Sequence, residues 1–165
     1  MPQTDAALLA LRVVFGLFLS YHGINKLRGG LAGTARWFAG MGLKWPKWQA
    51  RIAATTEIGA GWLFAAGLIT PIAASGIIGV MIVAIVIDHW KIGFFIFEPG
   101  EGWEYCASIA VVALVVATIG PGRWSLDNAF DLEFRGWWGA TAAAALGIGG
   151  ALTQLAVSYR PRRQA

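Results

Sequence analysis

Charged residues are scarce in this sequence. Asp, Glu, Lys and Arg make up only 13% of its 165 residues, whereas 57% are hydrophobic, and the mean hydropathy is +0.60. A soluble domain of this size needs roughly twice that share of charge. The composition therefore excludes a soluble globular protein and predicts an all-α integral membrane helical bundle, whose first partner is the lipid bilayer.

Cysteine and histidine are also scarce. The chain has one cysteine, Cys106, in an apolar run, so it can form no intrachain disulfide and has no CxxC redox pair. Its two histidines, His22 and His89, lie at the ends of apolar runs. Such a small set is poorly suited to hold haem or a redox metal, and we predict that the chain binds neither by itself.

Acidic residues are fewer than basic ones, nine against 13, which gives a net charge of +4. In a soluble protein this balance favours nucleic acid as a partner. Here the basic residues gather in the segment 25–51 and in the C-terminal tail, which is how membrane proteins set their topology. We therefore predict no nucleic-acid partner.

Apolar runs of membrane-spanning length occur five times. They cover residues 6–24, 52–69, 72–90, 103–119 and 137–157. We expect residues 1–165 to form a single membrane domain. The second and third runs form a helical hairpin with its turn at Thr70 and Pro71.

Two further features concern helix packing. Leu31, Trp37, Phe38 and Met41 predict a short helix in the membrane interface. In the fifth run small residues recur every four positions, which lets two helix backbones approach closely. They are Gly139, Ala143, Gly147 and Ala151. Packing inside the bundle and docking of a partner both fit this stripe, and we favour packing.

The distribution of basic residues predicts the orientation. With five spans, the segments 25–51 and 91–102 and the C-terminal tail share one side, which holds ten Lys and Arg residues against two on the other. The positive-inside rule then places the N-terminus outside and the C-terminus in the cytoplasm. We expect a multi-pass protein of the cell (plasma) membrane.

The same alternation of sides brings most polar residues of the spans to one face. These residues are His22, Lys26, Glu57, Asp88, His89 and Glu104. Arg12 lies ten residues before His22, hence about 15 Å deeper. An intramembrane arginine needs a partner, and Glu57 is the deepest acid on this side. We predict that the two side chains contact each other, as a ligand site or as a purely structural pair.

The chain also resembles the DoxX family of small membrane proteins. The matching residues are Gly23-x-x-Lys26-Leu27, Glu57-x-Gly59-x-Gly61-x-Leu63-x-x-x-Gly67, His89 and Gly120-Pro121-Gly122-Arg123-Trp124-Ser125-Leu126-Asp127. The resemblance covers about residues 6–130 and implies a four-helix unit, to which residues 131–165 add a fifth helix and a basic tail. The Gly-Pro-Gly segment stops the fourth helix, and Ser125 or Asp127 can cap the next turn.

Some DoxX members are named as subunits of quinone-linked oxidoreductases. The resemblance thus implies an accessory subunit of a membrane oxidoreductase or respiratory assembly, with a protein partner and a quinone or lipid pocket. The candidate ligand-binding residues are Arg12, Glu57, His22, Lys26 and His89. A small-molecule or proton carrier and a scaffold or assembly factor without a ligand remain alternatives. Because no flavin motif or CxxC pair is present, we favour a protein that is not an enzyme on its own.

Overall fold

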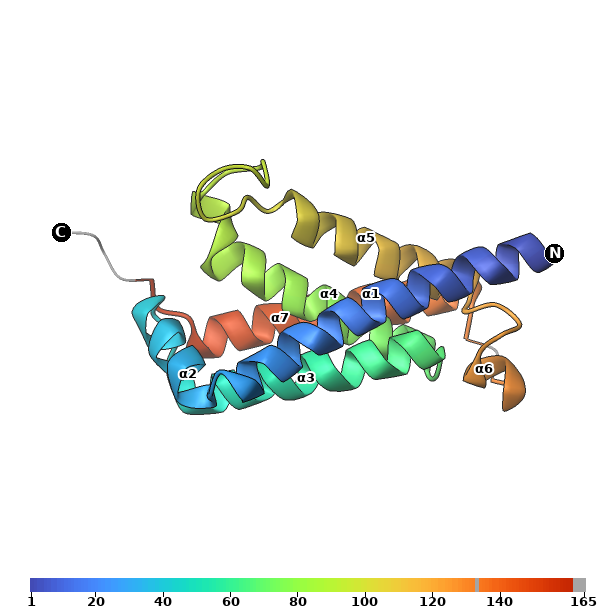
Figure 1. Cartoon of the computed structure of the whole chain (residues 1–165), viewed down its shortest axis with the longest axis horizontal. Helices are drawn as coiled ribbons and strands as arrows, with labels where there is room; N and C mark the ends of the chain where they lie inside the picture. The colour runs from blue at the N-terminus through green and yellow to red at the C-terminus, as the bar shows by residue number, and fades with distance from the viewer. Residues whose placement is uncertain (133, 162–165) are drawn as a thin grey trace.

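Helices form most of the computed structural model, which describes residues 1–132 and 134–161 (Figure 1). In chain order they are α1 (Pro2–Arg28), α2 (Leu31–Gly40), α3 (Pro46–Ala66), α4 (Thr70–Ile87), the 3₁₀ helix η1 (His89–Lys91), α5 (Glu104–Ile119), α6 (Leu126–Ala129) and α7 (Gly136–Ser158). Among the described residues extended pairing is limited to one antiparallel bridge, between Leu43 and Tyr159. The all-α prediction is confirmed.

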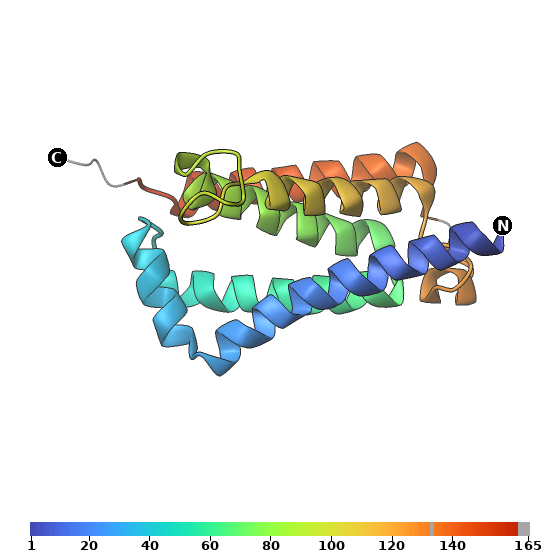
Figure 2. The same ribbon diagram turned by 45° about the horizontal axis from the view of Figure 1, so that its top comes forward.

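The five long helices run along one bundle in alternating directions. Figure 2 shows α1 and α3 as one layer and α4, α5 and α7 as the other. At one end, called the α2 end, lie α2, η1 and the segment 92–103. At the opposite end, called the α6 end, lie the N-terminus, the turn 67–69 and α6 (Figure 1). The predicted alternation of the long helices is therefore present.

Within the described part of the chain, three helices are long and apolar enough to cross a membrane: α1, α4 and α7. The apolar helix α5 has 16 residues, and α3 has 21 but includes Lys47, Arg51 and Glu57. The chain is thus a helical membrane protein. The count of five spans, the orientation and the plasma membrane as location stay predictions.

The ends of the helices differ from those predicted. Helix α1 continues past the expected residues 6–24 at both ends, and α3 begins at Pro46 rather than near residue 52. Pro71 lies in the first turn of α4 instead of in the hairpin turn, because the first helical turn needs no hydrogen bond from that nitrogen. The interfacial-helix residues do form a helix, α2. In the predicted basic tail, Arg162 and Arg163 lie outside the described residues.

Helices α1 and α3 touch through their backbones. A Cβ atom added at Gly16 would lie 2.5 Å from the carbonyl oxygen of Gly61 and 2.8 Å from the amide nitrogen of Ala65. Such contacts between small residues are typical of helix pairs in membranes. They fix how α1 and α3 are placed along each other, and this decides which side chains meet.

The small-residue stripe of α7 is buried within the bundle. Ala143 and Ala151 are 0% and 2% exposed, and a Cβ at Gly147 would lie 2.9 Å from the side chain of Ile78 on α4. The favoured interpretation of this stripe, packing inside the bundle, is therefore confirmed.

Candidate functional site

Arg12 and Glu57 lie in two separate sites. Arg12 hydrogen-bonds the carbonyl of Ala65, which is eight residues beyond Glu57 on α3 and hence about 12 Å along the helix. The predicted contact between Arg12 and Glu57 is therefore wrong. The physical reason is the glycine contact of Gly16 with Gly61, which places Arg12 toward the α6 end.

Arg12 is fully buried near the α6 end. Its Nη1 donates to the carbonyl of Ala65 at 3.1 Å, and its Nη2 donates to the carbonyl of Trp124 at 2.6 Å. Asp127 lies close enough to act on its charge. Gly67 ends α3 with φ +63°, and a Cβ there would collide with the guanidinium. Arg12 therefore ties α1 and α3 to the segment after α5.

Asp127 completes this structural cluster. Its carboxylate accepts hydrogen bonds from the amides of Ile69 and Thr70 at 2.6 and 3.0 Å, and from the Thr70 hydroxyl at 2.6 Å. Asp127 thus caps the start of α4. The Ser125 hydroxyl accepts from the amide of Asn128 and caps α6, as the sequence predicts.

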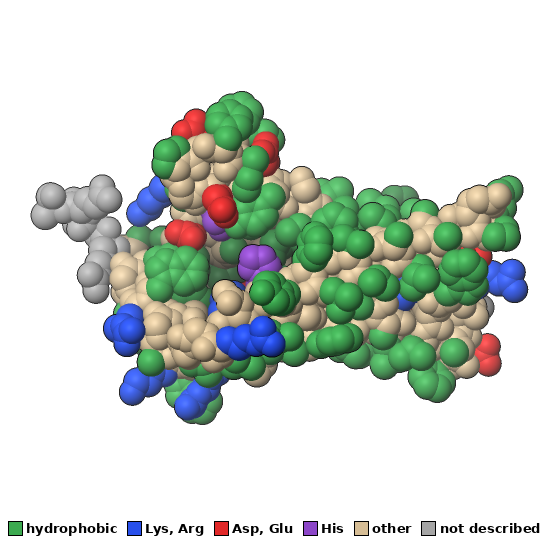
Figure 3. All heavy atoms as spheres, viewed as in Figure 1, with side chains coloured by type: hydrophobic (Ala, Val, Ile, Leu, Met, Phe, Trp, Pro, Cys, Tyr) green, Lys and Arg blue, Asp and Glu red, His purple; other side chains and the backbone are tan. Residues whose placement is uncertain are grey.

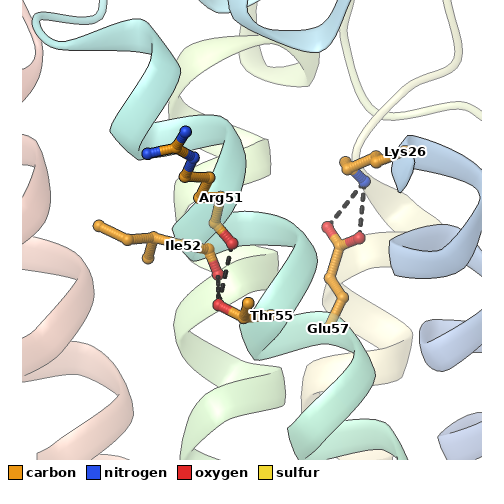
Figure 4. A network of polar contacts seen from close by, with 5 residues as sticks. All are labelled: Lys26, Arg51, Ile52, Thr55 and Glu57. Carbon is orange, nitrogen blue, oxygen red and sulfur yellow. Dashed lines mark hydrogen bonds and ion pairs between the residues drawn. The ribbon is translucent and has the colours of Figure 1, made fainter. Parts of the chain in front are cut away.

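A second pair of charges is buried near the α2 end. Lys26, in the last turn of α1, donates to both carboxylate oxygens of Glu57, at 2.8 and 2.7 Å (Figure 4). The two side chains are 18% and 7% exposed. On the same stretch of α3, Thr55 bonds only its own helix, at the carbonyls of Arg51 and Ile52. Glu57 therefore turns toward α1.

The Lys26–Glu57 pair forms the polar end of a cavity of about 300 Å³ between α2, α3, α4 and α7. Asp88 and His89 line the same end. Glycines line much of the remaining wall, on α4 and on α7. They are Gly76, Gly79, Gly147 and Gly150. Of these four, Gly150 is the one at which an added Cβ would meet open space.

His89 presents its ring to the cavity, but both of its nitrogens are engaged elsewhere. Nδ1 lies 2.7 Å from the carbonyl oxygen of Glu101, and Nε2 lies 2.8 Å from the hydroxyl of Tyr105. A carbonyl only accepts, so in the neutral ring Nδ1 carries the hydrogen and the Tyr105 hydroxyl donates to Nε2. This histidine therefore holds η1 against α5.

The profile of the DoxX family matches residues 7–90, half of the chain. The chain belongs to the DoxX family. The match runs from α1 to η1 and includes Lys26, Glu57 and His89, whereas the segment 120–127 of this DoxX protein lies beyond it. No curated protein and no solved structure matched the chain.

Three of the five predicted site residues of this DoxX protein line the cavity: Lys26, Glu57 and His89. His22 is exposed on α1, one turn before Lys26, and does not line the cavity. Arg12 belongs to the cluster near the α6 end. Among the described residues, no three His, Cys, Asp or Glu side chains lie close enough to hold a metal ion.

Sequence reasoning missed the contribution of the fifth helix to this site. Gln154 on α7 lines the cavity and donates a hydrogen bond at 2.8 Å to the side-chain oxygen of Gln49 on α3. A signal was present, because Gln154 is a long polar residue in a helix that otherwise consists of apolar and small residues. Such residues in membrane helices usually bond a neighbouring helix.

Proposed function

We propose that this DoxX protein is an integral membrane accessory subunit that binds the polar head of a quinone or lipid in the cavity near the α2 end. The observation that carries the proposal is the buried Lys26–Glu57 pair at the polar end of a cavity of about 300 Å³. Pockets for small molecules begin at about this size and combine apolar walls with a few placed polar groups.

The contribution of the Lys26–Glu57 ion pair to stability does not by itself explain why these two charges are present. A buried pair of charges often adds little net stability, because both groups lose their hydration. Ionisable residues inside a membrane protein are functional candidates by default. Lys26 keeps one N–H that Glu57 does not use, and the carboxylate keeps spare lone pairs. A polar head can therefore bind beside the pair without breaking it.

The accessory role rests on two arguments. The sequence has no CxxC pair and no flavin motif, so an electron-transferring partner would supply the redox chemistry. The naming of some family members as oxidoreductase subunits agrees with this role. A carrier is less well supported, since carriers usually have spanning helices that are broken at mid-membrane, whereas α1, α4 and α7 are continuous.

Ligand binding is tested on the purified protein in nanodiscs, titrated with a decyl-tailed benzoquinone. Trp37 lines the cavity, so we expect saturable quenching of tryptophan fluorescence. Gly150→Leu should weaken binding at least tenfold, because Gly150 lines the cavity and a Cβ there meets open space. Gly149→Leu is the matched control, since Gly149 also meets nothing but does not line the cavity.

Two results would count against the proposal. Non-saturable quenching of the wild-type protein, or equal loss of binding in the Gly149 and Gly150 variants, removes the ligand site. Mild-detergent purification from the native host, followed by mass spectrometry, tests the accessory role. Recovery of the protein without any co-purifying redox subunit contradicts that part.

A further inference from the structure

The cavity opens on the flank of the bundle. Three large apolar residues line it and are nevertheless about half exposed: Trp37 on α2, Ile52 on α3 and Leu146 on α7, at 50%, 47% and 53%. A residue that both lines a cavity and reaches the surface marks its opening. These three side chains are apolar and lie on three different helices, so hydrophobic surface borders the opening. A ligand can enter from the bilayer and leave its tail there.

The polar end of the cavity contains a carboxylate acceptor, Asp88, that receives no hydrogen bond from the described residues. Two of the three N–H groups of Lys26 are already given to Glu57. The Asp88 carboxylate has no hydrogen-bond donor among the described residues, and its nearest ionic contact is Nε2 of His89 at 4.0 Å. Gln154 gives one of its two amide N–H groups to Gln49, which leaves its second N–H as a donor and its oxygen as an acceptor.

The charges at this end of the cavity favour a neutral head group that donates hydrogen bonds. The titratable residues that line the cavity are Lys26, Glu57, Asp88 and His89. Lys26 offsets Glu57, so Asp88 leaves one negative charge when His89 is neutral. A phosphate or carboxylate head is repelled by that charge, whereas a neutral head that donates hydrogen bonds is favoured.

We infer that the cavity binds a hydroquinone in preference to the oxidised quinone. A hydroquinone head carries two O–H donors, and the oxidised head carries only carbonyl acceptors. Asp88 accepts a hydrogen bond from one hydroxyl, and the tail leaves through the opening between α3 and α7. A tenfold preference for the reduced form raises the reduction potential of the bound couple by about 30 mV. This inference rests on the proposed function.

The test compares two forms of one probe. The decyl-tailed benzoquinone is titrated into nanodisc-embedded protein, once oxidised and once chemically reduced under argon. We expect the wild-type protein to bind the reduced form at least tenfold more tightly. Asp88→Asn removes the charge and adds a donor, and should bring the two affinities within about threefold. Glu98→Gln is the matched control, because Glu98 is an exposed acid in the nearby segment that does not line the cavity.

The outcomes separate this inference from the proposed function. Equal affinities, or tighter binding of the oxidised form, overturn the preference and leave the site in place. Saturable binding of neither form overturns the proposed function as well. A preference that persists unchanged in Asp88→Asn removes Asp88 from the explanation and overturns the inference. The wild-type comparison needs no variant, so it stands even if Asp88→Asn fails to fold.

Discussion

Two buried charged residues, Glu57 and Arg12, are neutralised in different ways. Glu57 meets a full opposite charge, the ammonium of Lys26, at 2.7 Å. Arg12 instead donates to two backbone carbonyls, and Asp127 supplies the nearby negative charge. Carbonyl partners bind Arg12 to the backbone of other segments and so make it a fold-defining residue. The Lys26–Glu57 pair borders a cavity and keeps an unused N–H donor and unused carboxylate lone pairs that can bind a ligand.

Removal of the Arg12 charge should destabilise the protein strongly. Arg12→Met leaves the carbonyls of Ala65 and Trp124 without their donor, and we expect a loss of about 3 kcal/mol in the free energy of unfolding. Arg123→Met is the control, since Arg123 lies exposed in the same segment and should cost less than about 0.5 kcal/mol. Denaturant titration in detergent micelles measures both. Similar losses would show that the Arg12 hydrogen bonds do not hold the α6 end together.

From the sequence one can predict at which end of the bundle a polar residue lies, but not which side chain it contacts. Alternation of the spans correctly brought Lys26, Glu57 and His89 to one end of the bundle. It could not decide between Lys26 and Arg12 as the partner of Glu57. That choice depends on how far α1 slides along α3, which the contact of Gly16 with Gly61 fixes across the intervening chain. Spacing within one helix carries no information on such a shift.

At the scale of elements, α7 is the fifth long helix, which we expected to be an addition to a four-helix unit. It packs against α4 and α5 through its small residues and supplies one wall of the cavity. Hydropathy was enough to predict that α7 exists, because its apolar length is unambiguous. The beginning of α3 was missed because its first turn is polar, and polar residues in a helix resemble a loop when only hydropathy is considered.

Packing of α7 can be tested with two neighbouring residues. Gly147→Leu places a side chain where even a Cβ would lie 2.9 Å from Ile78 on α4, and we expect a loss of about 2 kcal/mol in stability from overpacking. Leu146 is 53% exposed, so Leu146→Ala should change stability by less than about 0.5 kcal/mol. Thermal unfolding followed by size-exclusion chromatography compares them. Equal melting temperatures would contradict the close approach of α7 to α4.

At the scale of the whole molecule, charge is distributed unevenly along the bundle axis. Figure 3 shows Lys and Arg side chains gathered around the α2 end, with hydrophobic side chains over much of the flank. The exposed tryptophans at this end include Trp45 and Trp48, and the guanidinium of Arg51 lies 5.0 Å from the Trp48 ring. Aromatic and basic residues together suit the headgroup layer of a membrane.

The predicted orientation, with the α2 end in the cytoplasm, has a testable consequence for two fusions. A reporter enzyme that is active only outside the cytoplasm should be inactive when fused after Tyr159, since the α2 end carries most of the basic residues. The same reporter fused after Asp131, in the segment at the α6 end, should be active. An active reporter after Tyr159 together with an inactive one after Asp131 would show that the topology is the opposite of the predicted one. Activity at both positions would contradict the alternation of the long helices across the membrane.

The hydrogen bond from Arg12 to Trp124 also sets an order of events during synthesis. The two residues are 112 positions apart, so the ribosome needs roughly 6–20 s after it has made Arg12 to deliver its partner. Throughout that interval the Arg12 guanidinium lacks one of the two carbonyl partners that it has in the folded protein. We therefore expect α1 to depend on insertion machinery, or on water drawn into the bilayer, until α5 and the segment after it have been made.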